Sequence, residues 1–172
     1  MTASELQPNE YSSFYKSYIE KTASFNLFDS LHQSRTDLIE VLKTVAVQNK
    51  QLFKYAPEKW SIQDVILHLI DAERIFCYRA LCISRNDATH FPGFNENDFV
   101  NFAGADARDF DSLVNEFQMV RNSTLQLFET FNVNQILKIG IAAENPISVR
   151  AIGFIISGHT FHHIQILNDR YL

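Results

Sequence analysis

Apolar residues recur at three- and four-residue spacing along four long stretches of the chain. This period places them on one face of an α-helix, so the pattern predicts four amphipathic helices. The scarcity of glycine and proline, five and four residues in 172, favours such long helices. The predicted helices cover residues 27–50, 61–84, roughly 109–131 and 148–172. The third carries an apolar stripe of Leu113, Phe117, Val120, Leu127 and Phe131.

Two of these helices have clear start signals. Ser61 is a favourable N-cap, and Asp64 follows at the third helical position, where its carboxylate can bond back to the cap. Ser148 is the corresponding N-cap of the last helix. Each cap is flanked by a pair of apolar residues placed to form a hydrophobic staple, namely Trp60 with Val65 and Ile147 with Ile152.

The remaining segments predict shorter elements. Residues 1–25 contain a short apolar pattern that indicates a small helix against the main body. Residues 85–108 lose all periodicity and are rich in turn residues, which predicts a long loop, and residues 132–147 predict a connection with a short extended piece at Ile136–Ile139. We therefore expect one all-α domain over residues 1–172, a four-helix bundle with a short N-terminal helix and a long loop between helices two and three.

Composition and charge exclude several classes of function. A hydrophobic content of 46% with 15 Phe indicates a folded, aromatic-rich interior. The net charge of −5 lacks the basic surface that nucleic-acid binding requires. No signal-like N-terminus or membrane span is evident, so we expect a cytoplasmic protein. Cys77 and Cys82 point about 140° apart on one helix, so we expect two reduced thiols.

Three of the six histidines lie within five residues near the C-terminus. His159 and His163 are one helical turn apart on one face, about 6 Å between Cβ atoms, which is the H-x-x-x-H geometry of a helical metal site. Thr160 stands where the H-E-x-x-H motif of metalloproteases has its glutamate. A third ligand must come from elsewhere, and His68 is suitable because it lies at a compatible height on the second predicted helix.

Each histidine alone has a simpler explanation as a buried imidazole bonded to a carbonyl. Together, His68, His159 and His163 favour a divalent metal site that leaves a coordination position open for water and a small-molecule substrate. Imidazole ligands suit zinc or nickel better than magnesium or calcium.

Four other polar residues lie near the predicted ligands. Asp71 is one turn beyond His68 and could orient an imidazole, although a surface or interhelical ion pair is an equal alternative. His162 is turned about 100° from His163 and could assist the site, shuttle protons or lie on the surface. Glu73 and Arg74 point away and are interpreted as interhelical or loop-anchoring charges. The two remaining histidines are expected to be surface or loop residues, namely His32 and His90.

Several short motifs together resemble the DinB superfamily, the DinB/YfiT-like metalloenzymes that are unrelated to the DNA polymerase of similar name. They are Lys59-Trp60-Ser61, His68, Asp71, Glu73-Arg74, Tyr78-Arg79, Arg85, Asp87, Phe91-Pro92-Gly93-Phe94, Gly158-His159, His162-His163 and Arg170-Tyr171-Leu172. The resemblance implies a four-helix bundle that binds nickel or zinc through His68, His159 and His163, and frequent homodimers. It also implies either transferases and isomerases that use a low-molecular-weight thiol (mycothiol, bacillithiol or glutathione) or proteins described only as metal-dependent hydrolases.

The leading hypothesis is therefore a metal-dependent enzyme that performs hydrolysis or thiol transfer on a small molecule. A non-catalytic metal- or small-molecule-binding module, such as a stress-response accessory protein, is the alternative, and the lack of an evident general base supports it. A purely structural bundle with core histidines is a third. The segment from Phe91 to Phe94 is either a lid over the site or a hydrophobic plug at the end of the bundle.

Overall fold

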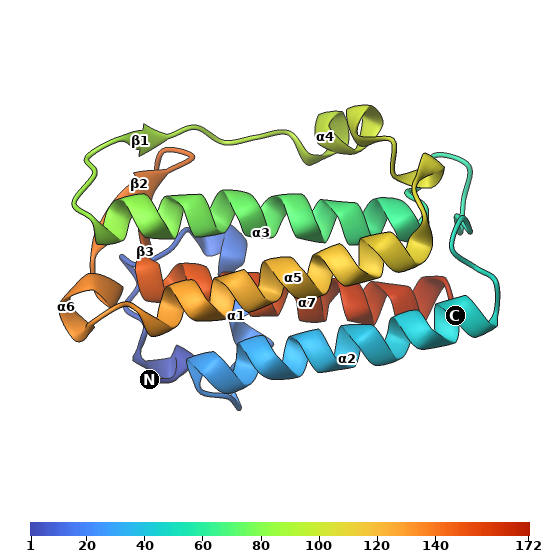
Figure 1. The fold of residues 1–172 in the computed structure, drawn as a ribbon. Coiled ribbons are helices and arrows are strands. Elements are labelled where there is room, and N and C mark those ends of the chain that lie inside the picture. Colours follow the sequence, from blue (N-terminus) through green and yellow to red (C-terminus); the bar gives the residue numbers. More distant parts are fainter.

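Four long helices lie side by side in the computed structural model, which describes residues 1–172 (Figure 1). The chain is thus the all-α four-helix bundle that the periodicity predicts, with only small strands added. The bundle helices are α2 (Leu27–Val47), α3 (Ile62–Ser84), α5 (Phe110–Glu129) and α7 (Val149–Arg170). No helix combines the length and the apolar character that crossing a bilayer would need.

The direction of the helices determines which residues can meet. Helices α2 and α7 run one way along the bundle, and α3 and α5 run the other way (Figure 1). Helix α7 packs against both α2 and α3, and α5 covers the other side of the same two helices. The start of α3 therefore lies level with the C-terminal half of its antiparallel neighbour α7.

The predicted caps are present at both marked helix starts. Ser61 Oγ accepts a hydrogen bond from Asp64 N at 3.0 Å, and Asp64 Oδ2 accepts one from Ser61 N at 3.0 Å, which completes a capping box. Ser148 Oγ accepts a hydrogen bond from Ala151 N at 3.0 Å. These bonds satisfy amide groups that have no partner within the helix, so they fix where α3 and α7 begin.

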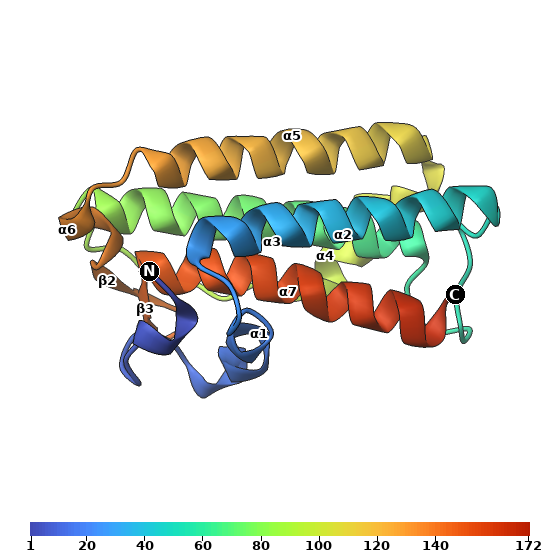
Figure 2. The same cartoon turned by 90° about the horizontal axis from the view of Figure 1, so that it is seen from below.

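The N-terminal segment forms three short helices rather than one. They are η1 (Ala3–Glu5), η2 (Ser13–Tyr15) and α1 (Lys16–Glu20). Helix α1 packs against α7, on the side of the bundle away from α5 (Figure 2). The predicted small helix against the main body is therefore confirmed, although it is only five residues long.

The predicted long connection between helices α3 and α5, residues 85–108, is present, but it contains short elements that its turn-rich sequence did not indicate. This segment runs along α3 and contains strand β1 (His90–Phe91), helix α4 (Glu96–Ala103) and helix η3 (Ala105–Ala107) (Figure 1). Asn95 caps α4, and Gly104 ends it with φ of 66°. Only Val100 of α4 is buried, so the helix is too short and too exposed to produce an apolar stripe in the sequence.

Residues 132–148 form a small β-structure at one end of the bundle. Helix α6 (Val133–Ile136) precedes strands β2 (Ile139–Ala142) and β3 (Asn145–Ser148). These strands pair antiparallel, with Ile139 opposite Ser148, and β1 adds to β2 in parallel. The expected extended piece therefore begins at Ile139, where the sequence interpretation ended it, because Ile136 still belongs to α6.

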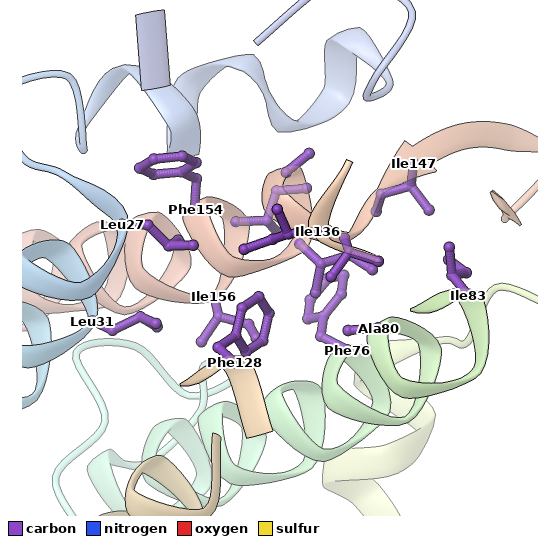
Figure 3. Close-up of a cluster of buried hydrophobic side chains, with 14 of the residues drawn as sticks. Leu27, Leu31, Phe76, Ala80, Ile83, Phe128, Ile136, Ile147, Phe154 and Ile156 are labelled. Atoms are coloured by element: carbon purple, nitrogen blue, oxygen red, sulfur yellow. The ribbon is translucent and has the colours of Figure 1, made fainter. Parts of the chain in front are cut away.

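Two apolar clusters fill the bundle, one towards each end. The cluster near the β-structure includes Leu31, Phe76, Phe128 and Ile156, which come from all four bundle helices (Figure 3). The other lies around the start of α3 and the end of α7. A buried polar layer separates them: Ser34, Arg121 and Thr160 each fall between the two clusters along their own helix, and Glu73 of α3 joins this layer through its hydrogen bonds to Arg121.

The predicted apolar stripe of α5 is correct only in its first half. Leu113 and Phe117 are buried as expected, but the stripe continues through Arg121, Thr124, Leu125 and Phe128. Val120, Leu127 and Phe131 are only half-buried. Because Arg121, a charged residue, occupies the middle of the buried face, the spacing of apolar residues alone did not identify that face of α5.

Candidate metal centre

The three predicted histidines come together in the structure. His68 projects from α3, and His159 and His163 project from α7. The Nε2 atom of His159 lies 3.0 Å from that of His68 and 3.0 Å from that of His163. Each residue offers one ligand atom within 4.8 Å of the others, and all three side chains are buried. The antiparallel packing of α3 and α7 makes this meeting possible.

The spacing of these nitrogens suits a small divalent cation. Zinc bound tetrahedrally at 2.0–2.1 Å from each nitrogen would separate two ligand nitrogens by about 3.3 Å, close to the distances found here. His159 Nε2 faces two other ring nitrogens, but a neutral ring nitrogen carries either one proton or one lone pair, so without a shared cation it can form only one well-directed hydrogen bond. His163 Nδ1 is also buried without a hydrogen-bond partner. The donor set therefore fits a divalent metal ion better than a network of hydrogen bonds.

Burial keeps these imidazoles in the form that can bind a metal. It lowers the pKa of His68 to about 4. Burial also lowers the pKa of His159 and His163 well below the ordinary value, and the charge that neighbouring histidines would carry adds to this. All three side chains are consequently neutral near pH 7, with lone pairs free for coordination.

A cavity of about 290 Å³ opens in front of the histidines. Trp60 and Tyr18 form its nearest aromatic walls, with ring centroids 4.8 Å from His68 and 5.3 Å from His159, respectively. Tyr171 near the C-terminus holds Trp60 in place, since its hydroxyl donates to the Trp60 carbonyl at 2.9 Å. The cavity gives a small molecule access to the three ring nitrogens. The other aromatic rings in its wall belong to Phe14, Tyr15, Phe76 and Phe94.

The two candidate supporting residues lie in different places. Asp71 makes no hydrogen bond to an imidazole, and its carboxylate lies 3.8 Å from Arg74 on the same helix, as the ion-pair alternative describes. His162 lines the cavity, with its ring centroid 5.2 Å from that of Tyr18 and 5.3 Å from that of His163. It stands beside the three converging histidines rather than among them.

The two ends of the segment from Phe91 to Phe94 lie in different surroundings, one typical of a hydrophobic plug and the other next to the site. Phe91 is buried in the apolar cluster near the β-structure, so it acts as a plug. Phe94 instead lines the cavity in front of the histidines, followed by Glu96 and Asn97 of α4. The sequence interpretation missed these two polar residues because it missed α4, although Asn95 was an available N-cap signal.

A buried ion pair lies next to the histidines and was only half anticipated. Glu73 is an interhelical charge, as expected, and its carboxylate accepts from Arg121 Nε at 2.8 Å and Nη2 at 2.9 Å. Arg121 Nη2 also donates to Thr160 Oγ1 at 3.0 Å. Thr160, which stands where metalloproteases have their glutamate, therefore points into this polar layer.

The remaining expectations for histidines and cysteines agree with the structure. His32 and His90 are exposed, away from the other four histidines. Cys77 and Cys82 are free and half-buried. Cys77 Sγ lies 3.1 Å from Thr124 Oγ1, and burial raises the pKa of Cys77 to about 12, so this thiol is not reactive near pH 7.

A helical bundle with three neutral imidazoles at the base of an open cavity belongs, by its geometry, to the class of bundles with a metal-type site between facing helices. Residues 30–167 match the sequence profile of the DinB superfamily, and the chain belongs to that family. No curated protein matches the sequence.

One solved structure with the same fold is YfiT from Bacillus subtilis. It is described as a probable metal-dependent hydrolase with an unusual four-helix bundle topology. The superposition has a TM-score of 0.72 at 16% sequence identity, and it covers 96% of this chain and 91% of YfiT. At this identity the similarity establishes the fold, in agreement with the family match.

Proposed function

We propose that this protein is a metal-dependent hydrolase of a small molecule, with His68, His159 and His163 binding one zinc or nickel ion. The observation that carries the proposal is the convergence of three neutral Nε2 atoms at the base of a cavity of about 290 Å³. The description of YfiT as a probable metal-dependent hydrolase supports the same reaction class.

The charge of the cavity favours hydrolysis over thiol transfer. Glutathione-type thiols carry carboxylates, which need lysine or arginine side chains or similar donors in their binding site. The cavity in front of the histidines is lined by neither residue type. We therefore place thiol transfer second, as the reaction to expect if hydrolysis is not found.

The side chains around the histidines have distinct parts in this proposal. A bound divalent ion would supply Lewis acidity and lower the pKa of a coordinated water molecule. Trp60 and Tyr18 shield two of the imidazoles from bulk water and hold them against the cavity. Tyr18 stays protonated near pH 7, since burial and then the charge of Glu96 raise its pKa, so it can donate a hydrogen bond to a substrate. His162, which lines the cavity outside the ligand set, is placed to accept a proton.

The proposal is tested with small esters, amides and thiol-conjugation substrates, using protein loaded with zinc or nickel and protein treated with a chelator. We expect hydrolysis of at least one ester or amide, lost on chelation and restored by the metal. His159→Ala should reduce this activity by about 100-fold or more, because it removes the central ligand. His32→Ala, an exposed histidine on α2, serves as the matched control and should retain full activity.

Two outcomes would contradict this function. Hydrolysis that survives both chelation and His159→Ala would show that the histidines are not its source. Tight metal binding without turnover of any substrate class would support the non-catalytic binding module instead.

A further inference from the structure

The wall of the cavity has an unusual chemical composition. Six aromatic rings other than imidazoles face it, from Phe14, Tyr15, Tyr18, Trp60, Phe76 and Phe94. Glu96, the first residue of α4, is the single carboxylate in the wall, and neither lysine nor arginine takes part. Aromatic faces and a carboxylate are the two groups that proteins use to bind organic cations.

Glu96 has no partner of its own within the protein. Its side chain forms neither an ion pair nor a hydrogen bond, and it is half-buried rather than fully hydrated. Burial raises the pKa of Tyr15 and of Tyr18, and the charge of Glu96 raises both further. The Glu96 carboxylate therefore lies close to these two rings of the aromatic wall. A charge in this position attracts a cation entering the cavity and repels an anion.

Two cationic side chains beside the cavity, Arg79 and Lys21, have partners other than Glu96. Arg79 lines an adjoining cavity that also includes Glu96, and its Nη2 donates to the Pro92 carbonyl at 2.6 Å. Its guanidinium lies 5.6 Å from the ring centroid of Phe76 and 5.9 Å from that of Phe94. Lys21, beyond His162, donates to Gln165 at 2.6 Å. Neither side chain forms an ion pair with Glu96.

We propose that the cavity binds a small organic amine in its ammonium form, with the cation between Glu96 and the aromatic rings. This inference rests on the proposed function, because it names the substrate class of the same site. A metal ion held by the histidines would repel the ammonium group, whereas the Glu96 carboxylate would attract the ammonium group. The bound amine would consequently direct its opposite, reacting end towards His68, His159 and His163.

Trp60 provides a direct way to test ligand binding. It is the single tryptophan of the chain and lines the cavity, so its fluorescence reports on occupancy. The probes are 2-phenylethylamine and 3-phenylpropionate, which share an aromatic body and carry opposite charges. Both are titrated into metal-free and zinc-loaded protein. We expect the amine to bind about tenfold more tightly than the carboxylate in the metal-free protein.

Glu96→Gln should abolish the preference for the amine and bring the affinity ratio of the two probes close to one. Asp98→Asn is the matched control, because Asp98 is also in the first turn of α4 but is exposed and does not line the cavity. This control variant should keep the tenfold ratio. Comparing the two variants separates the effect of a charge in the cavity wall from that of a charge at the helix start.

Three outcomes would overturn the proposal: binding of neither probe at millimolar concentration, an equal or higher affinity for the carboxylate in metal-free protein, or an unchanged ratio in Glu96→Gln. Because the ratio is measured without metal, a failure of zinc binding would contradict the proposed function and leave this test intact. Normal zinc binding without amine preference would contradict only the present inference.

Discussion

Arg121 is the residue whose environment most constrains the interior of the bundle. Its side chain is fully buried, and each of its five N–H donors has a partner. Besides the bonds to Glu73 and Thr160, Nη1 donates to the Leu31 carbonyl at 2.8 Å and to Ser34 Oγ at 2.7 Å. These partners come from α2, α3 and α7, so one α5 side chain connects all four helices. One of the partners, Thr160, directly follows His159 in the sequence.

Removing this charge should destabilise the protein strongly. Arg121→Met leaves Glu73 as a buried carboxylate without its counterion, and we expect a loss of about 3–5 kcal/mol in the free energy of unfolding, measured with urea. The control is Arg74→Met, which breaks another α3–α5 arginine–glutamate pair, at 2.7 Å from Glu116, where the arginine is half exposed. That change should cost about 1 kcal/mol or less. Equal losses in the two variants would contradict the structural role of Arg121.

The sequence revealed only part of this interior at the residue scale. Glu73 could be assigned to an interhelical charge because its angle from His68 follows from helix geometry alone. Arg121 could not, since an arginine at a core position looks like an exposed residue until its four partner residues are known. Those partners are far apart in sequence, and only tertiary packing brings them together.

Helix α1 lies very close to α7 at Gly158, immediately before His159. A Cβ atom at Gly158 would lie 2.1 Å from the Tyr18 carbonyl oxygen, so no other residue fits without moving α1. This contact also positions the Tyr18 ring against His159 and His162. The absence of a side chain at one position of α7 thus determines one wall of the cavity.

Gly158→Ala should push α1 away from α7 and loosen the cavity wall. We expect faster amide hydrogen exchange in residues 16–22, with the middle of α3 unchanged. Gly93→Ala is the control, because a Cβ there would meet only Ala143 Cβ at an ordinary 3.5 Å. If exchange in residues 16–22 stayed as slow in Gly158→Ala as in the original protein, the close contact would not control α1.

Helix starts and long helices were predictable because their causes are local. The cap bonds of Ser61 and Ser148 involve residues three positions away. An apolar stripe can be recognised from the sequence of its own helix, without knowledge of the helices packed against it. Helix α4 and strand β1 are short, and they are stabilised by neighbours distant in the chain, since α4 packs against α3 and β1 pairs with β2. Their placement, and with it the position of Glu96, therefore required the structure.

At the scale of the whole molecule, the N-terminal segment is tied to the start of α7 by a buried ion pair. Glu10 Oε2 accepts from Arg150 Nε and from Ser148 Oγ, each at 2.7 Å. Glu10 is only 4% exposed, so this pair closes the end of the bundle near the β-structure. The same helix start that Ser148 caps is thereby connected to the first residues of the chain.

This ion pair predicts a specific dependence of stability on pH. Burial alone would raise the pKa of Glu10, but bonds from Arg150, Ser148 and the Gln7 amide lower it below the ordinary 4.5. A carboxyl with a lower pKa in the folded state stabilises the protein above about pH 4.5, and this contribution is lost as pH falls through the folded-state value. Glu10→Gln should be less stable at pH 7, and its melting temperature should fall less between pH 5 and pH 3.

A parallel fall in melting temperature for Glu10→Gln and the original protein would contradict this assignment. Glu20→Gln is a suitable control, because Glu20 is exposed and its only charged partner is Lys16, at 3.8 Å on the same short helix. It should retain the original pH dependence.

The proposed metal centre involves all three scales, since it depends on three side chains, on two antiparallel helices and on the topology that makes these helices neighbours. The sequence identified the three histidines and their compatible heights, whereas the direction of α3 relative to α7 appeared only in the fold. The single most direct measurement is zinc stoichiometry by elemental analysis and calorimetry on protein purified without an affinity tag. We predict one ion per chain, a loss of binding in His159→Ala and full binding in His32→Ala. Occupancy well below one ion per chain, or unchanged occupancy in His159→Ala, would contradict the central claim.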